Sequence, residues 1–143
     1  MQTCYKCKKL QKNTSFGKDN HTKTGLSNLC NTCKRFKSDA YRKTNKGRYA
    51  AVKRVAKLKK YNFNIDLNFY IELINRPCFY CGDILDLKTN SYFIDRLNSK
   101  LGYEKQNVVP CCSICNFMKQ SLSQKDFENQ CDKISLYKRK RPG

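Results

Sequence analysis

A chain of 143 residues has the length of one ordinary domain, but a hydrophobic content of 39% and the lack of tryptophan argue against one large core. The chain carries 30 Lys and Arg against 11 Asp and Glu, a formal charge of +19. This charge predicts nucleic acid as the partner and argues against a protein adaptor without affinity for polyanions. No run of about 18 apolar residues is present, so we expect no membrane partner.

The 10 cysteines are the second informative feature of the composition. The opening stretch MQTCYKCKKL has no apolar leader, so we expect a reducing, intracellular compartment and metal-bound thiolates rather than disulfides. Four Cys-x-x-Cys pairs are present, and two such pairs supply the ligands of one tetrahedral Zn²⁺. We therefore predict two structural zinc ions, held by Cys4, Cys7, Cys30 and Cys33 and by Cys78, Cys81, Cys112 and Cys115.

Residues 1–33 form the first predicted module. The segment between its two cysteine pairs is rich in turn residues, including Gly17 and Gly25, so we expect a zinc ribbon or a related treble-clef-like finger. His21, the only histidine of the chain, lies in this segment. A lone histidine in a polar loop is more often a solvated surface residue than a catalytic base.

Residues 34–62 are predicted to be a basic helical linker, because 12 of the 27 residues from 34 to 60 are Lys or Arg. Val52, Val55 and Ala56 give it a thin apolar stripe, and Gly47 is a candidate break between two helices. We expect this segment to contact nucleic acid rather than to serve as a solvated linker. The predicted contacts are Lys34, Arg35, Arg42, Lys43, Arg48, Lys53, Arg54 and Lys57, with Lys119 further along the chain.

Residues 66–75 predict a short helix that begins after the N-cap Asp66 and packs an apolar face into the core. A last helix is expected within residues 123–143, where Ser123 and Asp126 form a capping-box-like start. Phe127, Cys131 and Ile134 fall on one face of that helix, so we expect Cys131 to be a buried core thiol. Residues 138–141 add a basic tail.

The central segment, within residues 63–122, is bracketed by the second set of cysteine pairs. Residues 92–94 predict a strand that delivers Asp95, and Val108 with Val109 predict the return strand. A helix is expected to begin near Cys112. Because Cys111 adjoins Cys112, the spacing to Cys115 decides the ligand, and we take Cys111 as a packing residue.

The order Cys78-x-x-Cys81, Asp95-Arg96, Asn107 and Cys112-x-x-Cys115-Asn116-x-x-Lys119 resembles the zinc-stapled HNH endonucleases of the ββα-metal type. The resemblance covers about 42 residues and implies a strand, a loop, a strand and a helix around a structural zinc. It also implies that Asp95 and Asn116 hold a catalytic Mg²⁺ (or Mn²⁺) and that Asn107 orients the general base. The chain departs from the pattern at Arg96, because the family has its general-base histidine there.

Arg96 cannot act as a base, since a guanidinium has a pKa above about 12 and offers only donors. Three interpretations follow. Catalysis persists, with Arg96 gripping the phosphate and the proton passing to a metal-bound hydroxide, to a tyrosine such as Tyr92 or Tyr103, or to water. Alternatively, the fold binds nucleic acid without turnover, or His21 folds back into the site.

The sequence thus predicts a small, metal-stapled α+β chain with a zinc ribbon, a basic helical linker, an HNH-like ββα-metal module and a C-terminal helix. The function expected from the resemblance is a metal-dependent endonuclease, a monomer or dimer, that binds double-stranded DNA and nicks or cleaves it. A phage, viral or mobile-element setting accords with the resemblance. The alternative is a zinc-dependent DNA- or RNA-binding protein of a larger nucleoprotein assembly.

Overall fold

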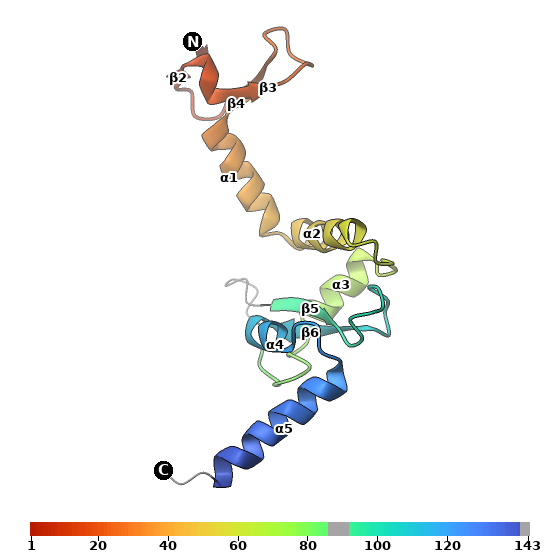
Figure 1. The fold of residues 1–143 in the computed structure, drawn as a ribbon. Helices are drawn as coiled ribbons and strands as arrows, with labels where there is room; N and C mark the ends of the chain where they lie inside the picture. Colours follow the sequence, from red (N-terminus) through yellow and green to blue (C-terminus); the bar gives the residue numbers. More distant parts are fainter. Residues whose placement is uncertain (86–91, 141–143) are drawn as a thin grey trace. The chain divides into compact units, whose positions relative to one another are not determined.

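The structure of the chain is a computed structural model that describes residues 1–85 and 92–140, with only the backbone described at Tyr92 (Figure 1). The chain divides into two compact units, Met1–Arg48 and Tyr49–Gly143, and each is described by itself. Within the described residues, no helix is both long enough and apolar enough to span a bilayer.

The first unit contains two short antiparallel hairpins followed by a helix. Its elements are β1 (Gln2–Thr3), β2 (Leu10–Gln11), η1 (Asn13–Ser15), β3 (Phe16–Lys18), β4 (Leu26–Cys30) and α1 (Asn31–Arg42). Strand β1 pairs with β2, and β3 pairs with β4 with an irregular register after Phe16. The small core consists of three cysteines and one aromatic ring: Cys4, Phe16, Cys30 and Cys33.

Helix α1 begins immediately after Cys30 and leaves this core at once. Cys33 is buried, whereas every residue from Lys34 to Lys43 is exposed. A charged helix that buries no face of its own needs an outside partner to stabilise it beyond its intrinsic propensity.

The basic segment is interrupted earlier than the sequence predicted. Helix α2 (Asn45–Leu58) starts after Thr44, whose Oγ1 accepts a hydrogen bond of 3.1 Å from the N–H of Gly47. The prediction that Gly47 breaks the helix is therefore wrong, because Gly47 lies inside α2. A Cβ at this position would lie 2.0 Å from the carbonyl oxygen of Tyr41, so glycine permits the close turn between the helices.

The second unit is a hairpin packed between helices. Its elements, after the start of α2, are α3 (Leu67–Ile74), β5 (Tyr92–Arg96), β6 (Val108–Cys112), α4 (Ser113–Lys119) and α5 (Gln124–Lys140). Strands β5 and β6 are antiparallel, with Asp95 opposite Val109 and Arg96 opposite Val108. The prediction of an N-cap at Asp66 is confirmed, since its Oδ1 accepts a hydrogen bond of 2.9 Å from the N–H of Phe69.

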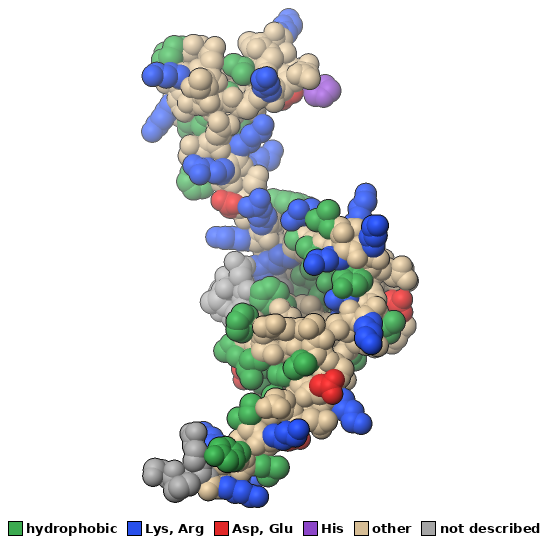
Figure 2. All heavy atoms as spheres, viewed as in Figure 1, with side chains coloured by type: hydrophobic (Ala, Val, Ile, Leu, Met, Phe, Trp, Pro, Cys, Tyr) green, Lys and Arg blue, Asp and Glu red, His purple; other side chains and the backbone are tan. Residues whose placement is uncertain are grey.

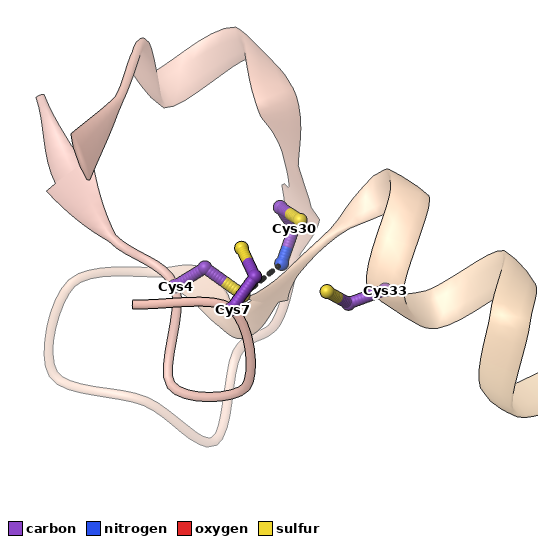
Figure 3. Close-up of side chains that lie close together, drawn as sticks. All are labelled: Cys4, Cys7, Cys30 and Cys33. Carbon is purple, nitrogen blue, oxygen red and sulfur yellow. Dashed lines mark hydrogen bonds between the residues drawn. The ribbon is translucent and has the colours of Figure 1, made fainter. Parts of the chain in front are cut away.

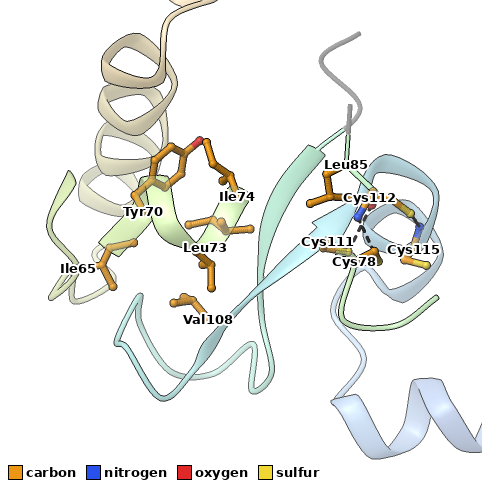
Figure 4. Close-up of a cluster of buried hydrophobic side chains, with 11 residues drawn as sticks. Ile65, Tyr70, Leu73, Ile74, Cys78, Leu85, Val108, Cys111, Cys112 and Cys115 are labelled. Atoms are coloured by element: carbon orange, nitrogen blue, oxygen red, sulfur yellow. Dashed lines mark hydrogen bonds between the residues drawn. The ribbon is translucent and has the colours of Figure 1, made fainter. Parts of the chain in front are cut away.

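The core of the second unit joins α3, the hairpin and the second cysteine cluster (Figure 4). Tyr70, Leu73 and Ile74 of α3 pack toward Val108, and the cysteines lie at the other end of β6. Helix α2 contributes Tyr49 and Val52, which pack against this core. The hairpin is therefore held from both ends, by apolar contacts at one and by the cysteines at the other.

Helix α5 begins as predicted but is packed only at its start. Ser123 Oγ accepts a hydrogen bond of 3.1 Å from the N–H of Asp126. Phe127 is buried against Tyr80, with ring centroids 5.2 Å apart, whereas Cys131 is half-buried and Ile134 is exposed. The expectation that Cys131 is a buried core thiol is wrong, because the helix leaves the core after its first turns.

Candidate functional site

The first cysteine cluster is built from a tight knuckle and a helix start (Figure 3). In the knuckle, the N–H of Lys8 donates to the carbonyl of Cys4 at 2.9 Å, and Lys8 has a φ of 58°. The N–H of Cys30 donates to Cys4 Sγ at 3.3 Å. The second pair, Cys30 and Cys33, lies at the start of helix α1, with Cys30 as its N-cap.

The second cluster has the same pattern of backbone hydrogen bonds. The N–H of Gly82 donates to the carbonyl of Cys78 at 2.9 Å, and Gly82 has a φ of 77°, where glycine is free of strain. The N–H of Cys112 donates to Cys78 Sγ at 3.3 Å, and Cys112 is the N-cap of α4. The two clusters thus share the same pattern of backbone hydrogen bonds.

Both clusters fit a tetrahedral metal ion. In each, the four sulfur atoms lie within 4.8 Å of one another. A Zn–S bond of about 2.3 Å requires sulfur atoms about 3.8 Å apart, and the Sγ atoms of Cys81 and Cys112 are 3.8 Å apart. The structure thus brings together the eight cysteines predicted to bind zinc. Cys111 lies outside the cluster, and its buried thiol donates to the carbonyl of Cys112 at 3.3 Å.

The backbone around each cluster favours the thiolate form that a metal requires. The N–H groups of Cys30 and Cys7 lower the pKa of Cys4 to about 6. Desolvation opposes ionisation of Cys78, but backbone N–H groups, first of all that of Cys112, outweigh it and lower its pKa to about 7. Burial and neighbouring cysteine side chains raise the pKa of Cys33 and of Cys81 in the same clusters, so metal binding must still release protons from these thiols.

Apart from the two cysteine clusters, the second unit contains a polar candidate site centred on Asp95. It lies on β5 and is 7% exposed. Its Oδ2 accepts a hydrogen bond of 2.7 Å from the Tyr80 hydroxyl and lies 3.0 Å from the ammonium of Lys119. Both contacts are made by Oδ2, which leaves Oδ1 as the carboxylate oxygen without a hydrogen bond or ion pair among the described residues.

Lys119 does not take the surface position that the sequence suggested for a contact with nucleic acid. Its side chain is completely buried, and its Nζ donates to the carbonyl of Arg96 at 3.0 Å as well as pairing with Asp95. A lysine in this position neutralises a buried carboxylate and leaves no group for a phosphate.

Asn116 lies on α4, one helical turn before Lys119 and therefore on the same face. Because Lys119 touches Asp95, this face of α4 is directed at β5. Asn116 is half-buried, and its side-chain amide has no hydrogen bond among the described residues. Asp95 and Asn116 can thus offer one carboxylate oxygen and one amide oxygen, the donors that a hard cation such as Mg²⁺ prefers.

Arg96 is held by aromatic rings. Its guanidinium carbon lies 3.8 Å from the ring centroid of Tyr61 and 5.3 Å from that of Tyr103. A guanidinium nitrogen donates to the carbonyl of Leu101 at 2.7 Å. Stacking and hydrogen bonding fix the orientation of the cation while leaving it partly exposed.

Asn107 holds a loop and does not contact the Arg96 side chain. Its Oδ1 accepts from the N–H of Asn98 at 2.9 Å, and its Nδ2 donates to the carbonyls of Asn98 and Gly102 at 3.1 and 2.8 Å. The residue is 4% exposed, so these bonds are shielded from water. Asn107 therefore fixes the loop that follows Arg96.

The tyrosines near the site are poorly suited to take up a proton. Burial, followed by the hydrogen bond and charge of Asp95, raises the pKa of Tyr80 well above its ordinary range. Burial also raises the pKa of Tyr103, against the opposing charge of Arg96. The predicted alternative at Tyr92 concerns a side chain outside the described part of the structure.

His21 lies in the turn between β3 and β4 of the first unit. It is exposed, and its N–H donates to Asp19 Oδ1 at 3.1 Å. These features are those of a solvated turn residue.

The basic residues predicted to contact nucleic acid are mostly on the surface, and Figure 2 shows Lys and Arg side chains on both units. Arg48 is partly buried, and the exposed members of the set are Lys34, Arg35, Arg42, Lys43, Lys53, Arg54 and Lys57. On α2, Ala56 is buried and Lys53, Arg54 and Lys57 are exposed, so this helix buries one side and offers charge on the other.

The sequence analysis missed Tyr80 as a site residue. It lies between Cys78 and Cys81, and no sequence pattern signals that it reaches Asp95, 15 residues away. The spacing of Asn116 and Lys119 on one helix face was the available signal for the role of Lys119.

The fold and its sites define a small mixed α/β protein with two four-cysteine clusters able to hold metal. No family model matches the chain. Over 97 residues the chain is 32% identical to "Uncharacterized protein R423" of Acanthamoeba polyphaga mimivirus, so it has a viral relative. The match covers 68% of this chain and 18% of that protein, so the chain spans less than a fifth of the relative's length.

Among solved structures, the chain is similar to the rare-cutting HNH restriction endonuclease PacI. The two are 18% identical, with a TM-score of 0.48, and the superposition covers 96% of this chain and 95% of that chain.

Proposed function

We propose that this chain is a zinc-stapled, metal-dependent endonuclease of the HNH type that nicks or cleaves double-stranded DNA. The observation that supports the proposal is the buried carboxylate of Asp95 on β5, which Lys119 ties to α4, the helix that carries Asn116. Asp95 lies on β5, and Asn116 lies on the face of α4 that reaches Asp95 through Lys119. The order of the sequence motifs leads to the same assignment.

The residues of the site divide the work of phosphodiester hydrolysis. The Oδ1 atom of Asp95 and the amide oxygen of Asn116 would hold a Mg²⁺ or Mn²⁺ ion, which supplies Lewis-acid stabilisation of the phosphate and leaving oxygen when bound. The fixed, partly exposed guanidinium of Arg96 would bind a phosphate oxygen. Asn107 would keep the loop after Arg96 in place.

The exposed cations would bind the DNA backbone. Helix α1 is exposed along its length after Cys33, and α2 exposes Lys53, Arg54 and Lys57. Seven exposed Lys and Arg residues of this set would release condensed counterions from the duplex, so binding would weaken steeply as salt rises. The two zinc ions would hold the modules and take no part in the chemistry.

A second function, nucleic-acid binding without turnover, is favoured by one specific observation. Lys119 already pairs with Asp95, and the raised pKa values of Tyr80 and Tyr103 make these two tyrosines poor general bases. Loss of a general base typically slows a reaction by about 10²–10⁴-fold without abolishing it, so the observation weakens but does not remove the case for catalysis.

Nicking of supercoiled plasmid by the zinc-loaded chain with Mn²⁺ tests the proposal, with Asp95→Ala and Arg96→His as variants. We expect metal-dependent relaxation by the wild type, loss in Asp95→Ala, and faster nicking in Arg96→His because a base is restored. Tight, salt-sensitive binding in a gel shift without any relaxation, and without gain in Arg96→His, would instead establish the binding function.

A further inference from the structure

Lys119 is the largest fully buried side chain among the described residues, and the proposed chemistry does not use it. It lies at the end of α4, and Tyr80 lies in the knuckle of the second cysteine cluster. The two groups meet at a single atom, Asp95 Oδ2, at 3.0 and 2.7 Å. The Cys78–Cys81 knuckle and helix α4, which the cysteine cluster brings together, thus each supply one side chain that contacts the Asp95 carboxylate.

This convergence has two consequences for Asp95. Its Oδ2 is occupied by two donors, so a divalent cation can be ligated only through Oδ1. In addition, a full positive charge already sits beside the carboxylate in a site shielded from solvent, where charges act on one another more strongly than in water.

We propose, on the basis of the function proposed above, that Lys119 and Tyr80 are positioning residues for Asp95 and that Lys119 sets its affinity for a divalent cation. The ammonium serves as a resident cation: it neutralises the buried carboxylate while no metal is bound. It then restricts the metal to single-oxygen ligation and weakens its binding by charge repulsion. Tyr80 fixes the carboxylate without adding charge.

The alternative to this role is purely structural. A buried lysine paired with a buried carboxylate contributes to folding, and its removal leaves the carboxylate uncompensated. A structural role predicts that substitution of Lys119 leaves cation affinity unchanged or reduces it. A resident cation predicts the opposite sign, because removal of its charge raises the affinity.

The test is Mn²⁺ binding to the zinc-loaded full chain, measured from the loss of the free Mn²⁺ electron paramagnetic resonance signal. Lys119→Gln removes the charge and keeps a donor for Oδ2, and Lys119→Met removes both. We expect each to lower the Mn²⁺ dissociation constant by about tenfold or more. Lys119→Arg, which keeps the charge, should stay within about threefold of the wild type. Tyr80→Phe removes a neutral donor from Oδ2 and leaves the charge in place, so it should change the dissociation constant by less than about tenfold.

Zinc content and circular dichroism identify any variant that fails to fold. If Lys119→Gln and Lys119→Met do not fold, Tyr80→Phe and Lys119→Arg still test the proposal. A tenfold change in Mn²⁺ affinity in either of these variants would show that the charge of Lys119 does not set the affinity. Equal or weaker Mn²⁺ binding by folded Lys119→Gln would overturn the proposal while leaving the endonuclease function standing. Absence of Asp95-dependent Mn²⁺ binding in every variant would overturn both.

Discussion

Asn107 offers a sharp test of how the site loop is held. Its side chain makes three shielded hydrogen bonds to the backbone of Asn98 and Gly102. Asn107→Ala removes all three and leaves the carbonyl of the buried Gly102 without this partner. At about 1 kcal/mol for each bond, the free energy of unfolding should fall by about 3 kcal/mol.

A loss of that size is readily measured. For a domain of about 60–100 residues, 1 kcal/mol corresponds to about 4–8 °C, so the midpoint of thermal unfolding with zinc in excess should fall by about 12–24 °C. The matched control is the neighbouring Gln106→Ala, which removes one exposed hydrogen bond to Glu104 and should change the stability by less than about 0.5 kcal/mol.

The outcome also separates two roles for Asn107. The sequence suggested that it orients a general base, whereas the structure has it holding the loop. If Asn107→Ala unfolds within about 0.5 kcal/mol of the wild type while nicking is lost, the loop-holding account is refuted. A large loss of stability in Asn107→Ala with none in Gln106→Ala supports it.

Three further predictions follow from single contacts. Gly102→Ala should cost about 1–3 kcal/mol in urea unfolding, because its Cβ would lie 2.4 Å from the carbonyl oxygen of Asn62. Gly17→Ala should be nearly neutral, because its Cβ would meet only side-chain atoms of Lys34 and Asn31, at 3.5 and 3.8 Å. The raised pKa of Tyr80 keeps its proton in the folded chain while the unfolded phenol ionises near pH 10, so stability should fall as pH rises above about 10, and Tyr80→Phe should remove that part of the loss. Neutralising the exposed cations of α2 should reduce the slope of log affinity for duplex DNA against log salt by about 2–3, whereas Lys119→Gln should leave the slope unchanged because its ammonium is buried. The α2 cations in that variant are Lys53, Arg54 and Lys57. The first expectation is contradicted if Gly102→Ala has the same urea midpoint as the wild type. The second is contradicted if Tyr80→Phe loses as much stability above about pH 10 as the wild type, and the third if the α2 variant keeps the salt slope of the wild type.

Local rules predicted the parts of the structure that depend on short spacing. The Cys-x-x-Cys pairs predicted two clusters because two residues between ligands fit a knuckle or a helix start, and the structure brings these eight sulfurs together. The N-cap at Asp66 and the start of α5 at Ser123 followed from side chains that reach their own backbone within three residues. Such contacts require no knowledge of the tertiary fold.

Contacts between segments that are distant in the sequence could not be predicted from local patterns. A lysine is usually found on the surface of a protein, and only the packing of α4 on β5 reveals that Lys119 lies beside Asp95, 24 residues earlier. The stacking of Arg96 on Tyr61 joins residues 35 apart and likewise has no local signal. Helix α5 differs in the opposite way: Ile134 has helical spacing with Phe127, but it is exposed in the structure because α5 leaves the core after its first turns.

The central claim is that a divalent cation at Asp95 drives DNA cleavage, and the most direct test is the rate of plasmid nicking as a function of Mn²⁺ concentration. The comparison is between the wild type and Asp95→Asn, which preserves the shape of the side chain and removes its charge. The account predicts a saturable, Mn²⁺-dependent rate in the wild type that falls by at least about 10²-fold in Asp95→Asn, with DNA affinity unchanged. Equal rates in the two proteins would contradict the assignment of Asp95, and no Mn²⁺-dependent nicking by the wild type would contradict the enzymatic function itself.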